Sequence, residues 1–112
     1  MNLSEIQKIV FIEYKQNGYL NMWNLHGFNE QDIKIRDIAE LGLITTEVSE
    51  AIESVRSHWK DDIDISNLQN ECADVIIRTL NFMSRKGFNA EKIILYKNKI
   101  NLNRGLLHGK SV

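Results

Sequence analysis

Two short acidic motifs hold the residues of this chain that are best suited to bind a metal ion. Glu47 and Glu50 lie three residues apart, as do Glu71 and Asp74. On a helix this spacing places both carboxylates of a pair on one face, with Cβ atoms roughly 5–6 Å apart. Two such helices packed together bring four carboxylates into one cluster, and these repel one another unless cations lie among them. Because oxygen ligands suit Mg²⁺ or Mn²⁺, the motifs predict a divalent-metal site inside a helical bundle.

A basic helix face near the C-terminus has the residue types that bind phosphate. Lys97, Asn101 and Arg104 follow an i, i+4, i+7 pattern and therefore share one face. Beside a metal cluster, this face suits a phosphate chain, since Arg binds bidentately, Lys acts as a point charge and Asn donates without charge. The alternative, a basic helix end stabilised by the helix dipole, stays open.

An aromatic segment between the first two expected helices contains Trp23 and His26. Either side chain could stack on or hydrogen-bond to a nucleobase, and the alternative for Trp23 is packing against its own domain. The chain has no glycine-rich phosphate loop of the G-x-x-x-x-G-K type. Any nucleotide chemistry would therefore depend on the metal site.

Helices must position these residues, and the apolar spacing predicts an all-α chain. The sequence contains no proline, while Gly18, Gly87 and Gly105 are placed to end helices. Asn29 is expected to cap a short turn before the second long helix, and Ser66 with Gln69 fits a capping box. The predicted helices are Ser4 to about Gln16, near Arg36 to His58, Ser66 to about Lys86, and Asn89 to near Arg104.

The angular order of the side chains predicts which acids face the interior. In the second helix, Glu47 borders the apolar stripe, Glu50 lies one step farther out and Glu53 points to solvent. The third helix is apolar on two sides, and a polar strip runs between them. The second-helix stripe is Leu41, Ile44, Val48, Ala51 and Val55; the third-helix stripes are Ala73, Ile76, Ile77, Leu80 and Met83, and Leu68, Val75 and Phe82; the polar strip is Glu71, Asp74, Arg78 and Asn81.

One short chain can hardly cover both apolar sides of its third helix. We therefore expect a four-helix-type bundle that is completed by oligomerisation. Replacing Phe82, in the second stripe, with Lys should then yield monomers or insoluble protein.

Length and composition indicate one domain, residues 1–112, with no linker or internal repeat. The net charge of −1 gives no electrostatic reason to expect a nucleic-acid or membrane partner. Cys72 is the single cysteine, which excludes an intrachain disulfide and fits a reducing compartment. With no signal-peptide pattern at the N-terminus and no long apolar stretch, the expected location is the cytoplasm.

The order of the motifs resembles a known enzyme family. The sequence reads E-x-x-E, a loop, E-x-x-D and then K-x-x-x-N-x-x-R, over about residues 36–110. This order is similar to that of the MazG-like nucleotide pyrophosphohydrolases of the all-α NTP pyrophosphatase superfamily. The resemblance implies an oligomeric all-α bundle that binds Mg²⁺ and cleaves nucleoside triphosphates to monophosphates and pyrophosphate.

The resemblance also implies roles for individual residues. Glu47 or Glu50 would be the general base, and Trp23 would lie near the base of the nucleotide. Many relatives carry a further Glu where this chain has Thr46, which bears on the number of metal ions bound. The implied metal ligands are Glu47, Glu50, Glu71 and Asp74, and the implied phosphate contacts are Lys97, Asn101 and Arg104.

Two other classes of protein fit an all-α chain of this size. A di-iron carboxylate bundle needs Glu-x-x-His pairs, and no histidine of this chain has a Glu three residues upstream. A non-catalytic helical oligomerisation or interaction module would use the second apolar side of the third helix for a partner. Such a module would require neither metal nor turnover.

Overall fold

The structure is a computed structural model, and it describes residues 1–18 and 29–105. These residues form helices and no strand, which confirms the predicted all-α class. The helices are α1 (Leu3–Gln16), α2 (Glu30–Arg56), α3 (Ile65–Arg85) and α4 (Ala90–Arg104).

An Asn or Asp side chain caps the start of every helix and accepts a hydrogen bond from the backbone N–H three residues on. Asn89 caps α4 as predicted, whereas Asn2 and Asp64, rather than Ser4 and Ser66, cap α1 and α3. The cap at Asn29 begins α2 itself. The expected short turn is therefore the first part of one continuous helix, because nothing after Asn29 breaks the hydrogen-bond ladder.

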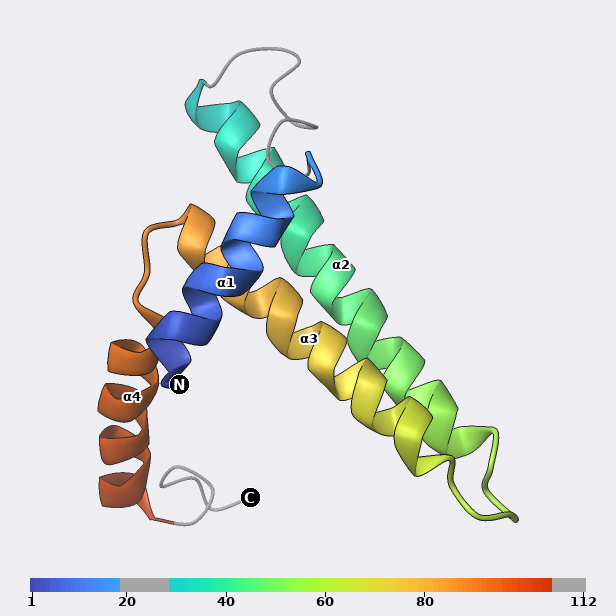
Figure 1. The fold of residues 1–112 in the computed structure, drawn as a ribbon. Helices are drawn as coiled ribbons and strands as arrows, with labels where there is room; N and C mark the ends of the chain where they lie inside the picture. Colours follow the sequence, from blue (N-terminus) through green and yellow to red (C-terminus); the bar gives the residue numbers. More distant parts are fainter. Residues whose placement is uncertain (19–28, 106–112) are drawn as a thin grey trace.

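The ends of α1, α3 and α4 were predicted correctly from the glycines, whereas α2 ends at Arg56 rather than at His58. Gly18, Gly87 and Gly105 all adopt a positive φ, near +70° to +80°, a conformation that glycine reaches without a steric penalty. Gly87 separates α3 from α4, and its positive φ turns the chain sharply. Figure 1 shows the result: α4 leaves the end of α3 and runs away from the α2–α3 pair.

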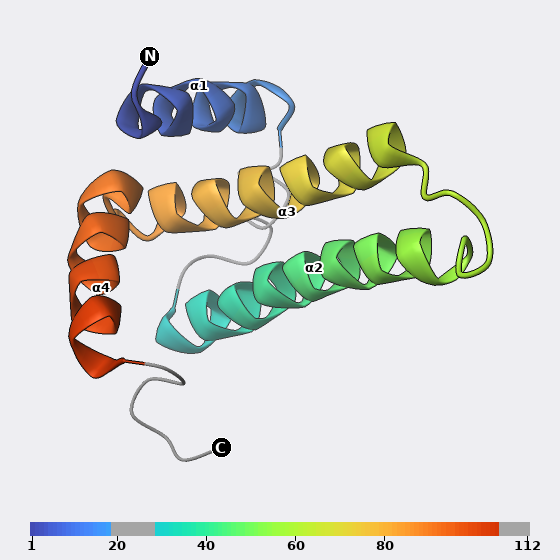
Figure 2. The ribbon, with the colours of Figure 1, turned by 90° about the horizontal axis from the view of Figure 1, so that it is seen from below.

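Helices α2 and α3 lie side by side and antiparallel, and they form the longest helix pair of the molecule (Figures 1 and 2). Helix α1 packs across α3, and α4 contacts α1 and α3. None of the described helices combines the length and apolarity that a membrane crossing requires.

Polar side chains hold α2 and α3 together. Asn67 Nδ2 donates to Ser54 Oγ over 2.9 Å, Arg78 Nε donates to Glu47 Oε1 over 2.7 Å, and Arg85 Nε donates to Glu40 Oε2 over 2.9 Å. These positions recur every seven residues on α2 and after eleven and seven residues on α3, spacings that return to the same face of a helix. We call this set the polar seam: Asp37, Glu40, Glu47 and Ser54 on α2, and Asn67, Glu71, Asp74, Arg78, Asn81 and Arg85 on α3.

An ion cluster closes the end of the polar seam that lies nearest α1. Arg85 pairs with both Asp37 and Glu40, and Lys86 Nζ lies 2.8 Å from Asp37 Oδ2. Arg36 Nε pairs with the other oxygen of Glu40, at 3.2 Å. Burial alone would raise the pKa of Asp37, but hydrogen bonds from Lys86 and Arg85 outweigh it and hold the pKa below its usual value. The cluster includes α1 because Tyr14 donates from its hydroxyl to Glu40 Oε1 over 2.8 Å.

Buried and partly buried hydrogen bonds join the first turns of α1 to the start of α4. The buried Gln7 side chain donates to Ser84 Oγ and to the carbonyl of Phe88, over 3.0 and 2.9 Å. It also accepts from the backbone N–H of Ala90, the first residue of α4, over 3.0 Å. In return, Glu91 accepts from the backbone N–H of Leu3, the first residue of α1. Each helix therefore satisfies an unpaired N–H at the start of the other.

Apolar side chains are mostly left on the outside of the single chain. Among the described residues, Leu80 and Ala90 are the buried apolar ones. Ile76 and Ile77 in the first α3 stripe are exposed, as are Leu41 and Val48 in the α2 stripe. The apolar stripes are therefore only partly covered in the single chain, since Leu80 is buried and Ile44 and Val55 are half-buried.

The overall dimensions agree with this exposure. The radius of gyration is 17.0 Å, whereas a compact chain of this length has about 13 Å. The accessible surface is 8709 Å², against about 6,300 Å² for a compact monomer of this mass. The single chain is therefore an open arrangement of helices.

We expect Asp37→Asn to lower the free energy of unfolding by about 2 kcal/mol at pH 7, because it removes a counter-charge from the partly buried Arg85 and Lys86. The pKa of Asp37 is lower in the folded state than in the unfolded state. The stability that Asp37 contributes is therefore present above the unfolded-state pKa and is lost as the pH falls through the folded-state pKa. Urea unfolding between pH 7 and pH 3 should therefore show the difference shrinking below about pH 4.

The matched control is Asp61→Asn, an exposed acid between α2 and α3. It should change stability by less than about 0.5 kcal/mol at any of these pH values. Equal effects of the two substitutions would contradict the structural role of the ion cluster.

Candidate metal site

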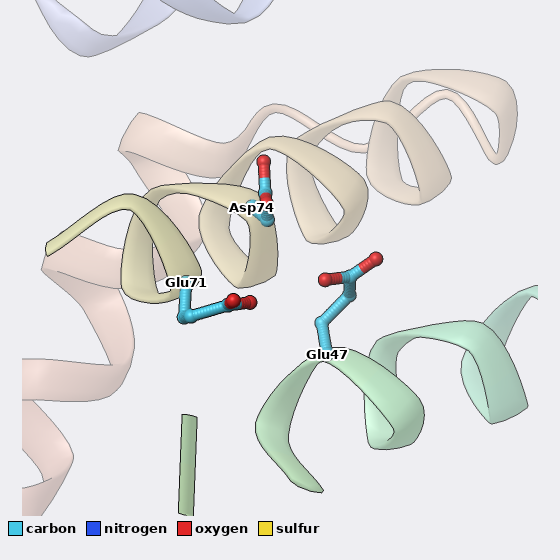
Figure 3. A group of neighbouring side chains, drawn as sticks. All are labelled: Glu47, Glu71 and Asp74. Carbon is cyan, nitrogen blue, oxygen red and sulfur yellow. The ribbon is translucent and has the colours of Figure 1, made fainter. Parts of the chain in front are cut away.

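Three of the predicted ligands meet between α2 and α3. Glu47, Glu71 and Asp74 each place one carboxylate oxygen within 4.8 Å of the others. Figure 3 shows Glu47 rising from α2 and Glu71 reaching toward it from α3, with Asp74 one turn along α3. We call these three residues the acidic triad. The spacing of the E-x-x-D motif supplies two members from one helix, and the antiparallel pairing supplies the third.

The acidic triad lies at the edge of the polar seam rather than deep inside it. The side chain of Glu47 is 12% exposed, Glu71 is half-buried and Asp74 is exposed. A ligand entering from solvent can therefore reach the carboxylates through Asp74, while Glu47 and Glu71 provide sheltered oxygens.

One buried oxygen of the acidic triad lacks a partner. Glu71 Oε2 is shielded from solvent and accepts no hydrogen bond from the described residues. A buried carboxylate oxygen without a donor is unfavourable, because the charge has lost its hydration without compensation. A hard divalent cation held by Glu47, Glu71 and Asp74 would supply that compensation, and three carboxylates are the donor set that Mg²⁺ or Mn²⁺ accepts.

Glu50 lies beside the acidic triad without belonging to it. Its side chain is exposed, and its carboxylate is not among the three that lie within 4.8 Å of one another. The negative charge of Glu47, followed by desolvation and the charge of Glu71, raises the pKa of Glu50. Glu53 on the same helix is exposed, in agreement with the predicted direction.

Thr46 adds no ligand to the acidic triad in this structure. Its hydroxyl donates to the carbonyl of Gly42 over 3.1 Å, within the backbone of α2. The side chain at this position is therefore already hydrogen-bonded to its own helix.

The predicted phosphate-binding residues lie elsewhere in the single chain. Lys97 and Arg104 are exposed on α4, while Asn101 is partly buried and its Oδ1 accepts no hydrogen bond from the described residues. Since α4 turns away from the α2–α3 pair, the structure does not bring these residues to the acidic triad of the same chain (Figures 1 and 2). Trp23 lies outside the described residues, as does His26.

Sequence reasoning placed Arg78 in the polar strip and gave it no role, yet its guanidinium contacts the acidic triad at Glu47. It also missed the pairing of Arg85 with Glu40. The sequence does contain a signal for both contacts. Glu40 and Glu47 on α2 are seven residues apart, as are Arg78 and Arg85 on α3, so two antiparallel helices can pair both sets at once.

Comparisons with models of protein families, with curated proteins and with solved structures find no match to this chain. The interpretation of the site therefore depends on two kinds of observation. One is the order and spacing of the motif residues, and the other is the geometry of the acidic triad.

We expect Glu50→Gln to raise the melting temperature at pH 7 when no divalent cation is present, since it removes a charge that Glu47 repels. The folded-state pKa of Glu50 is raised, so its charged form costs stability above that pKa and the cost disappears as the pH falls through it. Thermal melts at pH 7 and pH 4 in a chelating buffer should show the gain only at pH 7. Glu53→Gln, the matched exposed change, should show no gain, and an equal rise in both variants would contradict the charge clustering.

Proposed function

We propose that this chain is a metal-dependent nucleoside triphosphate pyrophosphohydrolase of the MazG-like, all-α kind. It would convert a nucleoside triphosphate to the monophosphate and pyrophosphate. The observation that carries the proposal is the acidic triad, in which two motif residues from α3 and one from α2 converge on one space. The motif order in the sequence supports the same reaction, and the unpaired Glu71 Oε2 supports a cation at that space.

The geometry divides the four motif acids between two tasks. Glu47, Glu71 and Asp74 would hold Mg²⁺, which neutralises phosphate charge and orients the bond to be cleaved. Glu50 is exposed next to the acidic triad, so it can accept a proton from the attacking water. Glu47 is the poorer candidate for the base, because its carboxylate already accepts from Arg78 and contributes to the acidic triad.

The contacts to the rest of the nucleotide belong to the proposal as well. Lys97, Asn101 and Arg104 would bind the phosphate chain, and Trp23 would lie against the base. Because α4 of the same chain lies away from the acidic triad, these residues would meet it in an assembly of chains.

The proposed assembly is a homodimer or homotetramer in which a second copy covers the exposed apolar faces of α2 and α3. The accessible surface exceeds that of a compact monomer by roughly 2,400 Å². Stable homodimer interfaces bury about 2,000 Å² or more in total, so the excess is large enough for such an interface. Ile38, Leu41, Ile52 and Ile76 are among the side chains that it would cover.

Pyrophosphate release from a panel of nucleoside triphosphates, with and without Mg²⁺, tests the function. We expect turnover with at least one nucleotide, and none in a chelating buffer. A chain that assembles but releases no pyrophosphate from any of them would instead be a helical interaction module, the alternative that the exposed apolar surface also fits.

We expect Glu71→Gln to lower kcat by about 10²-fold or more at saturating Mg²⁺, since charge-stabilising groups at reacting centres contribute on this scale. The substitution keeps the size of the side chain and removes one metal-binding charge. The matched control is Glu53→Gln on the exposed face of α2, which should leave kcat within about twofold. The measurement is the steady-state kcat of both variants. Comparable values would show that Glu71 has no role in the metal site.

We expect Ile76→Lys to shift the protein toward monomers, because a charge would enter the apolar interface. Ile76 is 57% exposed in the single chain, so the substitution should not disturb the fold of the monomer. Gln16→Lys makes the same change of charge at an exposed position on α1 and serves as the control. Sedimentation velocity at micromolar concentration is the measurement, and a wild-type chain that sediments as a monomer would refute the assembly.

A further inference from the structure

Two arginines of the polar seam are held in different ways. Arg85 is 10% exposed, pairs with two carboxylates and lies over the ring of Phe82, 5.4 Å from its centroid. Arg78 is 43% exposed, and Glu47 is its hydrogen-bond partner among the described residues. Releasing Arg85 would break two ion pairs at once and leave the partly buried Asp37 with Lys86 as its counter-charge. Releasing Arg78 would expose its guanidinium to water and leave one carboxylate without a counter-charge.

That one carboxylate belongs to the acidic triad. Arg78 Nε donates to Glu47 Oε1 over 2.7 Å, the short distance of a charge-assisted hydrogen bond. The acidic triad carries three negative charges within 4.8 Å, with Glu50 beside them. Arg78 is the basic residue of the described chain that contacts these acids. It is therefore the positive charge that offsets their repulsion when no metal ion is bound.

A divalent cation at the acidic triad would change this balance. The cation and the guanidinium would share the carboxylate of Glu47, and two positive charges on one carboxylate repel each other. The contact that gives way should be the weaker and more exposed one. Arg78 has a single carboxylate partner, and nearly half of its side chain lies in solvent. Hydration of the guanidinium can therefore readily compensate for the loss of the contact with Glu47.

We propose that Arg78 is the resident counter-cation of the acidic triad and that a divalent cation displaces it from Glu47. The proposal rests on the metal-binding part of the proposed function and extends it to an exchange of cations. Arg78 stabilises the metal-free protein and weakens metal binding by competing for one ligand. It acts through Glu47, so it is a positioning residue rather than a ligand.

The first test uses the wild-type protein and needs no substitution. The Nε–H group of Arg78 gives its own signal in a ¹H–¹⁵N NMR spectrum, and the hydrogen bond to Glu47 should place that signal away from those of exposed arginines. Titration with Mg²⁺ should move the Arg78 signal to the position typical of a hydrated guanidinium, while the Arg85 signal stays in place. An Arg78 signal that stays unchanged while Mg²⁺ binds would overturn the exchange.

The second test compares metal affinities. By calorimetric titration, Arg78→Gln should bind Mg²⁺ about three- to tenfold more tightly than wild type, since a partly exposed ion pair no longer competes. The control Arg56→Gln removes the same charge at an exposed position in the last turn of α2. That position is about 13 Å along the helix from Glu47, which is beyond the screening length at physiological salt. The Mg²⁺ affinity of Arg56→Gln should therefore equal that of wild type.

The outcomes separate this inference from the proposed function. If wild type releases pyrophosphate with Mg²⁺ but Arg78→Gln binds the ion no more tightly, the exchange is refuted and the function stands. If neither protein binds Mg²⁺, both are refuted. If Arg78→Gln binds Mg²⁺ more tightly in a chain that hydrolyses no nucleotide, the exchange stands and the function falls.

Discussion

The pairing of α2 and α3 through charged side chains is the constraint on which the rest of the structure depends. A carboxylate that is buried between two helices has lost its hydration. It is tolerated only when a cation or a hydrogen-bond donor compensates for that loss. Along most of the polar seam that condition is met, because Arg85 faces Glu40 and Asp37, and Asn67 faces Ser54. At the acidic triad, acid faces acid across the two helices. A local violation of the pairing rule inside an otherwise satisfied interface is typical of a functional site.

The same constraint determines where the apolar side chains lie. In most paired helices the facing positions are largely apolar, whereas here hydrogen-bonded and ion-paired side chains join the two helices and many apolar side chains stay exposed. Ile76 and Leu41 are exposed because Arg78 and Glu47 occupy the contact between the helices. The hydrophobic contribution to stability is therefore small within one chain, and the proposed contact between copies would supply most of it.

The sequence alone predicted those features that depend on one helix at a time. Residues three apart placed Glu71 beside Asp74, helical phase separated Glu47 from Glu53, and glycines marked the helix ends. Among the features that depend on two helices, the meeting of Glu47 with Glu71 and Asp74 was predicted, whereas the ion pairs between the helices were missed. Neither the Arg78–Glu47 pair nor the exposure of the apolar stripes follows from one helix, and the direction of α4 depends on Gln7, a residue in another helix.

The mutual capping of α1 and α4 has a consequence for the order of folding during synthesis. The bonds from Leu3 to Glu91 and from Ala90 to Gln7 join residues 88 and 83 positions apart. The α2–α3 hairpin involves closer residues and can form as soon as α3 leaves the ribosome, because short loops close at lower entropic cost. The start of α1, although made before α2, α3 and α4, has no cap from α4 until α4 emerges. Helix α1 is thus the earliest synthesised of these four helices and among the last of them to be secured.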